Sequence, residues 1–308
     1  MRLGWTAAAL IGSLGLAVPG KGLMRSPQPG RVLYGATVDR ITGLAQMRAA
    51  LASLPDRATV RVVFDRSEPA SYYATATRRL ARVSSVMGEL LDSSAERSIS
   101  AAGLRARARS YLHQLGSEVS IWEVGNELNG NWTGPYRQVA AKTRAAYAVL
   151  RGAHVPLALT LYANDFAPNH CGDGPNELTP VQFAQRYLPA NLRSGLSYVL
   201  LSYYPTQCHD VEPSSAVLAA HLRQLHHLFP GARLGFGEVG LPHAVTSSTV
   251  DKARQIMSWA YSLDPGLAYY AGGYFWWYAA EDALHPGAPL RRNLAQAFDA
   301  EHTALGRS

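Results

Sequence analysis

Apolar runs of strand length alternate along the chain with longer segments whose apolar residues recur at helical spacing. The short runs are rich in Val, Leu, Tyr and Trp and lack polar alternation, which is typical of parallel strands covered on both faces. Strands are predicted at 32–38, 59–65, 83–91, 119–125, 155–162, 196–204, 232–238 and 269–277. Between them, helical patterns cover 41–54, 72–80, 100–115, 135–150, 215–229 and 291–304.

Capping residues predict two further helices. Thr179 is placed to cap a helix that has Pro180 at its first position, and Ser248 with Asp251 three residues later resembles a capping box. The pattern then contains eight strand–helix units in 308 residues, which predicts one (β/α)8 barrel, or TIM barrel. The rival fold is a doubly wound open sheet, which normally has a glycine-rich first turn. The first predicted strand and turn, Tyr34-Gly-Ala-Thr-Val-Asp39, has no such turn.

The first twenty residues predict a targeting segment. Arg2 precedes an apolar stretch at 3–18, which Pro19 and Gly20 end. This stretch is short for a membrane span of about 20 residues, so a secretory signal peptide and a membrane anchor are both open. We expect a signal peptide or anchor at 1–20, a linker at 21–31 and the barrel at 32–308. The location expected is secreted or cell-surface, and contact with a membrane is expected only through the anchor.

Composition favours a folded protein and argues against nucleic-acid binding. Hydrophobic residues make up 47% of the chain and charged residues 17%. The net charge is +7, but all basic residues other than three lysines are arginines, which are spread over helical segments without a dense run. We therefore expect no nucleic-acid partner, and we expect a monomer.

The cysteines and histidines indicate a disulfide rather than a metal centre. Cys171 and Cys208 each follow a strand-like run, so both are expected in loops at the same face of the barrel. A disulfide between them is favoured, because it suits an oxidising compartment; two free thiols are the alternative. The histidines lack metal-ligand spacing, and there is no phosphate-binding loop, so neither a metal nor a cofactor is predicted.

Polar and aromatic residues gather where the predicted strands end. In a (β/α)8 barrel these carboxyl ends meet at one mouth, where active sites lie. Asn126 and Glu127 end the fourth predicted strand, and Glu238 ends the seventh. Aromatic rings stack on the C–H faces of sugars, while amides and charged groups bind their hydroxyls, so a carbohydrate site is predicted. The other side chains expected there are Arg61, Asp65, Glu89, Asp92, Asn164, Tyr203, Tyr204, Trp276 and Trp277.

Four sequence pieces resemble clan A of the retaining glycoside hydrolases. They are Trp122-Glu-Val-Gly-Asn-Glu127, Gly237-Glu-Val-Gly240, Arg61 within the second strand, and Ser202-Tyr-Tyr-Pro205, which is similar to endo-galactanases and cellulase-like members. The resemblance extends over about 32–300. It implies a (β/α)8 barrel with an acid/base glutamate on strand 4 and a nucleophilic glutamate on strand 7. The chain departs from many members by having Ser202 in place of His and Val239 in place of Thr.

The resemblance assigns roles to the two glutamates. Retaining hydrolysis of an O-glycosidic bond by double displacement needs two carboxyl groups about 5–5.5 Å apart, one of them protonated. Glu127 is expected to be the acid/base, with its pKa raised by the nearby ionised Glu238. Glu238 is expected to be the nucleophile, kept ionised by Arg61 and by a tyrosine hydroxyl, with Tyr204 favoured over Tyr203.

The remaining roles concern the substrate. Asn126 is expected to bind the 2-hydroxyl of the sugar at the cleaved bond, and Trp277 or Trp276 to form the floor beneath that sugar. The expected substrate is an extracellular poly- or oligosaccharide. The alternative is a non-catalytic, exported carbohydrate-binding or cell-wall interaction protein built on the same barrel.

Overall fold

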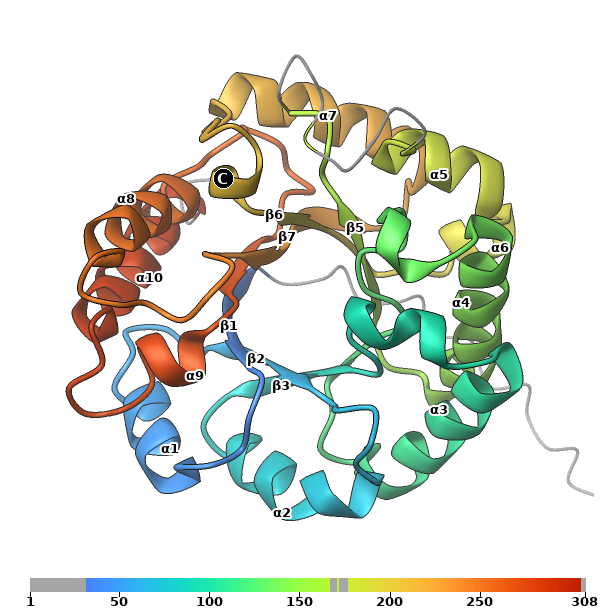
Figure 1. Ribbon diagram of the computed structural model, residues 1–308, viewed down its shortest axis with the longest axis horizontal. Helices are drawn as coiled ribbons and strands as arrows, with labels where there is room; N and C mark the ends of the chain where they lie inside the picture. The colour runs from blue at the N-terminus through green and yellow to red at the C-terminus, as the bar shows by residue number, and fades with distance from the viewer. Residues whose placement is uncertain (1–31, 167–170, 172–176, 306–308) are drawn as a thin grey trace, which may run out of the picture.

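The fold is a closed barrel of eight parallel strands surrounded by helices, as the ring of strands in Figure 1 shows. The computed structural model describes residues 32–166, 171 and 177–305, and the statements below concern these residues. Each strand pairs with its neighbours in the chain, and β8 closes the ring against β1. The strands are β1 (Leu33–Val38), β2 (Thr59–Val63), β3 (Ser85–Glu89), β4 (Ile121–Glu123), β5 (Leu157–Tyr162), β6 (Tyr198–Tyr203), β7 (Arg233–Val239) and β8 (Gly272–Trp276).

Helices follow the strands and form the outer layer. The α-helices are α1 (Leu44–Ala52), α2 (Ala70–Leu80), α3 (Ala101–Leu115), α4 (Tyr136–Leu150), α5 (Pro180–Tyr187), α6 (Ala190–Arg193), α7 (Ser215–Leu228), α8 (Val250–Tyr261), α9 (Ala279–Asp282) and α10 (Arg291–Leu305). Short 3-10 helices are η1 (Ser93–Ser98), η2 (Asn131–Thr133), η3 (Arg151–Ala153) and η4 (Pro205–Gln207). The predicted TIM barrel is confirmed.

Some predictions at the chain's N-terminus lie outside the described residues, namely the targeting segment at 1–20 and the linker at 21–31. None of the helices in the described part of the chain combines the length and apolarity that crossing a bilayer requires.

One of the two predicted helix caps is confirmed. Thr179 and Gln182 form a reciprocal capping box at the start of α5. The prediction for Ser248 and Asp251 is wrong, because α8 begins one residue after Thr249, which caps it without a side-chain hydrogen bond. The Ser248 hydroxyl instead contacts the hydroxyl of Thr246 at 2.9 Å.

The strands bury two separate layers, because successive side chains point to opposite faces. Trp122 on β4 faces outward into the large core between strands and helices, whereas its neighbours Ile121 and Glu123 face the barrel interior. A small apolar cluster fills the lower interior: Leu33, Met87, Ile121, Ala158, Tyr198, Leu200, Ala271 and Phe275. Toward the carboxyl ends, the inward positions become polar.

An irregularity in β7 turns Glu238 toward the barrel interior. β6 pairs Leu201 with Phe236 but then pairs Ser202 with Glu238, so Gly237 is an extra residue on β7. Strict alternation would place Glu238 on the outward face with Phe236, and the bulge reverses this. A β-carbon at Gly237 would lie 2.6 Å from the Thr160 hydroxyl, so glycine is needed where the bulge enters the barrel.

The predicted disulfide between Cys171 and Cys208 is confirmed. It joins the segment after β5 to the residue that follows η4, across 37 positions of sequence. The bond ties together two neighbouring loops at the rim of the barrel.

Candidate active site

A cavity of about 500 Å³ opens at the carboxyl ends of the strands. Both predicted catalytic carboxyl groups line it, together with aromatic side chains suited to stacking on sugar rings. The lining residues are Asp92, Ser93, Glu127, Trp132, Tyr162, Cys171, Tyr204, Gln207, His209, Glu238, Pro242 and Trp277.

Glu238 is held by donors on both of its carboxyl oxygens. Arg61 Nη1 lies 2.9 Å from Oε2, and the Tyr204 hydroxyl donates to Oε1 at 2.5 Å. Asn126 Nδ2 makes a longer contact of 3.5 Å with Oε2. A guanidinium group and a phenol together stabilise the carboxylate form, because hydrogen bonds and an opposite charge favour the ionised state.

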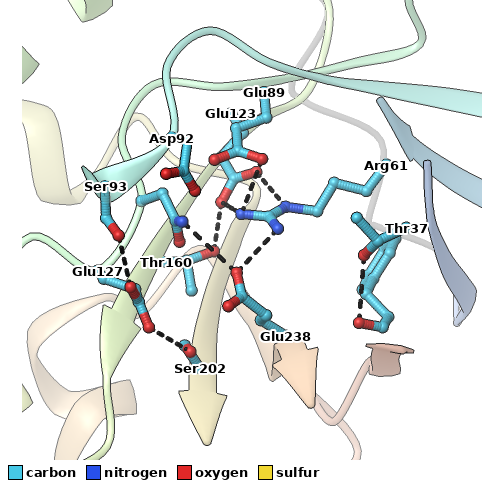
Figure 2. A network of polar contacts seen from close by, with 12 residues as sticks. Thr37, Arg61, Glu89, Asp92, Ser93, Glu123, Glu127, Thr160, Ser202 and Glu238 are labelled. Atoms are coloured by element: carbon cyan, nitrogen blue, oxygen red, sulfur yellow. Dashed lines mark hydrogen bonds and ion pairs between the residues drawn. The ribbon is translucent and has the colours of Figure 1, made fainter. Parts of the chain in front are cut away.

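Arg61 is fixed by two buried carboxyl groups inside the barrel, Glu89 and Glu123 (Figure 2). Its Nε and Nη2 donate to Glu123 at 2.7 and 3.2 Å, and Nη2 lies 3.2 Å from Glu89. The Thr160 hydroxyl donates to Glu123 at 2.5 Å. Burial raises the pKa of Glu89 well above its usual range, and the charge of Arg61 opposes this rise. The cluster leaves Nη1 of the fully buried Arg61 directed at Glu238.

Glu127 is held by hydroxyl groups rather than by a cation. The Ser202 and Ser93 hydroxyls each donate to one carboxyl oxygen at 2.6 Å, and Trp132 Nε1 donates to the Ser93 oxygen at 3.1 Å. Glu127 has a φ of 49°, in the left-handed region that costs a residue with a β-carbon about 1–2 kcal/mol. Its carbonyl accepts from the Gly130 amide at 2.8 Å, which closes the turn that directs the side chain into the cavity.

Burial raises the pKa of both carboxyl groups. For Glu238 the pKa rises to about 8, because burial and the charge of Glu127 outweigh Arg61 and Tyr204. For Glu127, burial is again the largest cause, and the charge that adds to the rise is that of Asp92. The pKa of Glu127 is thus raised mainly by burial and not, as the sequence analysis expected, by Glu238. Burial thus favours the protonated form of each group, while the donors that contact them favour the ionised form.

Some of the predicted site residues gather at this cavity. Those whose side chains line it or contact the carboxyl pair are Arg61, Asp92, Asn126, Glu127, Tyr204, Glu238 and Trp277. The Trp277 ring centre lies 5.4 Å from the guanidinium carbon of Arg61, which joins the aromatic wall to the charged cluster.

Two predicted aromatic residues face the opposite side of their strands. Tyr203 is buried in the outer core, where its hydroxyl donates to the Val211 carbonyl at 2.7 Å. Trp276 is buried in the same core, and its Nε1 donates to Asp282 at 2.9 Å. Each is the neighbour of the residue that lines the cavity, so the strand's alternation decided which of the pair enters.

Asp65 and Asn164 serve local backbone structure and do not line the cavity. Asp65 Oδ1 accepts from the amide and hydroxyl of Ser67 at 2.7 and 2.6 Å, which stabilises the turn after β2. Asn164 Nδ2 donates to the Leu178 carbonyl at 3.2 Å.

Ser93 and Ser202 were not predicted to contact Glu127. Ser202 carried a usable signal, since it is a polar residue at an inward position of an otherwise apolar strand. Ser93 follows β3 by a few residues and is placed by η1, which no periodicity in the sequence indicates. Among the described residues, no group of three or more His, Cys, Asp or Glu side chains could hold a metal ion.

Comparisons with known proteins find similarity in structure but not in sequence. Neither a family model nor a curated protein matches the chain. It is similar to a GH10 xylanase from Bispora sp. MEY-1, with a TM-score of 0.55, 15% identity and coverage of 87% of this chain and 97% of that one. It is also similar to the catalytic domain of the major endoglucanase from Xanthomonas campestris pv. campestris. The TM-score is 0.54 and the identity 14%, with coverage of 91% of this chain and 97% of that one.

A third similar structure is a family 1 β-glucosidase from Thermotoga maritima, with a TM-score of 0.54, 11% identity and coverage of 90% and 99%. The resemblance to clan A glycoside hydrolases is thus confirmed at the level of the fold. At such identities the chemistry has to be argued from the site itself.

Proposed function

We propose that the protein is a retaining glycoside hydrolase that cleaves an O-glycosidic bond in an extracellular poly- or oligosaccharide. Glu127 is the acid/base and Glu238 is the nucleophile. The observation that carries the proposal is the unequal surroundings of two carboxyl groups in one cavity: a cation and a phenol contact Glu238, and only hydroxyls contact Glu127.

In the first step, the carboxylate of Glu238 attacks the anomeric carbon while Glu127 gives its proton to the departing glycosidic oxygen. The C–O bond to the leaving group breaks, and a bond from the anomeric carbon to Glu238 forms. Tyr204 and Arg61 orient Glu238 for this attack, because each already contacts one of its oxygens.

In the second step, Glu127 takes a proton from water, and the water oxygen displaces Glu238 from the anomeric carbon. Two displacements restore the original configuration at that carbon. Trp277 supplies an apolar face for the sugar, and Asn126 is close enough to Glu238 to contact the sugar's 2-position.

The electrostatic interaction between Glu127 and Glu238 can be tested directly. The charge of Glu127 contributes to the pKa of about 8 at Glu238, so Glu127→Gln should lower the pKa of Glu238. Isotope-edited NMR of the carboxyl carbon would follow this titration. If the pKa of Glu238 were unchanged in Glu127→Gln, the two carboxyl groups would not interact electrostatically, which would contradict their action as a pair.

Export is part of the proposal. The apolar 3–18 stretch suits a signal peptide or a membrane anchor, and a disulfide persists best in an oxidising compartment. We propose a secreted or cell-surface monomer whose partner is a carbohydrate.

The activity is tested with aryl glycosides and polysaccharides. Glu127→Ala and Glu238→Ala should each abolish turnover of an activated glycoside. The control Glu118→Ala should leave turnover unchanged, because Glu118 precedes the amino end of β4, at the end of the barrel opposite the cavity. Near-normal turnover by either of the first two variants would refute the roles. Saccharide binding without hydrolysis by the parent protein would support the non-catalytic alternative.

A further inference from the structure

We propose that the cavity selects glycans with free, protonated amino groups and rejects acidic ones, and that Asp92 determines this selectivity. The inference rests on the proposed function and names its substrate class: a polymer or oligomer of amino sugars that carry unacylated amines.

The charge inside the cavity opposes the charge of the whole protein. The chain has a net charge of +7, yet the described residues that line the cavity include three carboxyl groups and no lysine or arginine. Arg61 lies behind the lining and already contacts Glu89, Glu123 and Glu238. A negatively charged sugar would therefore meet carboxylates without a cation free to neutralise it.

Asp92 is a fixed feature of this lining. It caps η1 by accepting from the Ser94 amide through Oδ1 at 2.9 Å, and the Ser94 hydroxyl donates to the same oxygen. No described residue donates a hydrogen bond to Oδ2. The Asp92 carboxyl belongs to the same cavity as Glu127 and Glu238, and Figure 2 shows all three.

The free hydrogen-bond donors and acceptors of the site also favour an amino sugar, independently of charge. The hydroxyls of Ser93, Ser202 and Tyr204 already donate to the carboxyl pair. By contrast, the acceptor Oδ1 of Asn126 is buried and has no hydrogen-bond partner among the described residues, although Nδ2 of the same side chain contacts Glu238.

In the cavity itself, Asp92 Oδ2 is therefore an open acceptor, while the hydroxyl donors beside the carboxyl pair are occupied. Gln207 and His209 can still donate, but they belong to the segment around η4 beside the disulfide. A carboxylate or sulfate on the sugar offers only acceptors, whereas an ammonium offers three donors and a complementary charge. A protonated amine matches both the negative charge of the cavity and its open acceptor, whereas a neutral hydroxyl matches only the acceptor.

The size of the effect follows from a unit charge near Asp92 in a partly shielded site. We expect an amine to be preferred over a hydroxyl by about tenfold to a hundredfold in affinity or kcat/KM. The preference should shrink as salt is added, since ions screen charges at a cavity that is open to solvent.

The test compares matched ligands with the wild-type protein and with Asp92→Asn. Calorimetry would measure binding of glucosamine oligomers, cello-oligomers and oligogalacturonates, and kcat/KM would be measured on aryl glycosides that differ only as amine, hydroxyl or carboxylate. Asparagine is also a good helix cap, so Asp92→Asn should fold normally, which a melting curve checks. Asp251→Asn, at an exposed carboxyl on α8, is the matched control.

The expected result is the order amine, then hydroxyl, then carboxylate, with the amine preference reduced about tenfold in Asp92→Asn and unchanged in Asp251→Asn. Equal or stronger binding of the acidic ligand, or an unaltered preference in Asp92→Asn, would overturn the inference. Turnover that requires Glu127 and Glu238 but shows no amine preference would reject the substrate class while leaving the hydrolase proposal standing. Amine-selective binding without turnover would support the amino-sugar ligand class and reject the hydrolase proposal.

Discussion

Arg61 forms ion pairs with three buried carboxyl groups, so its removal is the most informative perturbation of the site. The variant Arg61→Met keeps a long apolar side chain but leaves Glu89, Glu123 and Glu238 without their shared partner. Breaking a buried ion pair by removing one member costs about 3–5 kcal/mol of folding free energy. We expect a loss in this range at pH 8.

The loss should depend on pH in a definite direction. Arg61 lowers the pKa of Glu89 and Glu238, so in Arg61→Met both pKa values rise further above that of an unfolded glutamate, about 4.3. A group whose pKa is raised by folding stabilises the folded state at low pH, and this contribution is lost as pH increases toward the folded pKa. The parent loses the Glu238 proton only as pH rises through about 8, while the variant keeps it to higher pH. The penalty of Arg61→Met should therefore be smaller at pH 7 than at pH 9.

The size of this difference can be stated. Each carboxyl that keeps its proton in Arg61→Met but loses it in the parent adds about 1.4 kcal/mol per pH unit. Urea unfolding of both proteins at pH 7 and pH 9 gives the free energies. The control is Arg254→Met, which removes an exposed pair with Asp251 and should cost no more than about 1 kcal/mol at either pH. A penalty for Arg61→Met that is equal at the two pH values would refute the charge argument.

Other predictions concern the carboxyl pair and the disulfide. Tyr204→Phe removes the 2.5 Å hydrogen bond to the proposed nucleophile, so kcat/KM should fall about 10- to 100-fold, whereas Tyr203→Phe should retain activity; equal losses in steady-state assays would contradict this. Ser202→Ala removes a donor that lowers the pKa of the proposed acid, so the basic limb of the pH–rate profile should move to higher pH; a shift toward acid would count against it. Replacing Cys171 and Cys208 together by Ser opens a link across 37 positions and should cost about 4 kcal/mol of unfolding free energy in urea titrations; no loss would remove the disulfide from the stability account.

The fold could be predicted because its signals are local. Each buried parallel strand is a run of apolar residues, and each helix has its own period, so their alternation alone indicated the barrel. Strand lengths were overestimated, as at 83–91, where β3 covers only Ser85–Glu89. Apolar residues beyond a strand's end pack in the core as well, so hydrophobicity does not mark where pairing stops.

The site could be predicted only as far as strand ends reveal it. Tyr203 and Tyr204 are adjacent and chemically identical, and only the strand's alternation decides which one faces the cavity. Glu238 is a harder case, because the bulge at Gly237 reverses that alternation just before it.

The ion pairs that Arg61 forms with Glu89 and Glu123 were not predicted, for a different reason. Glu89 and Glu123 are charged residues within apolar strands, which is itself a sign of a buried ionic cluster. Their shared partner lies on another strand, however, and a pairing across the barrel interior leaves no trace in local sequence.

The stereochemistry of the product tests the central claim most directly. Proton NMR would follow the anomeric signal in the first minutes after the protein is added to a cleavable glycoside, before mutarotation mixes the anomers. Double displacement through Glu238 predicts a first-formed sugar with the configuration of the substrate. A first-formed sugar of the opposite configuration would show a single displacement by water and would contradict the paired roles of Glu127 and Glu238.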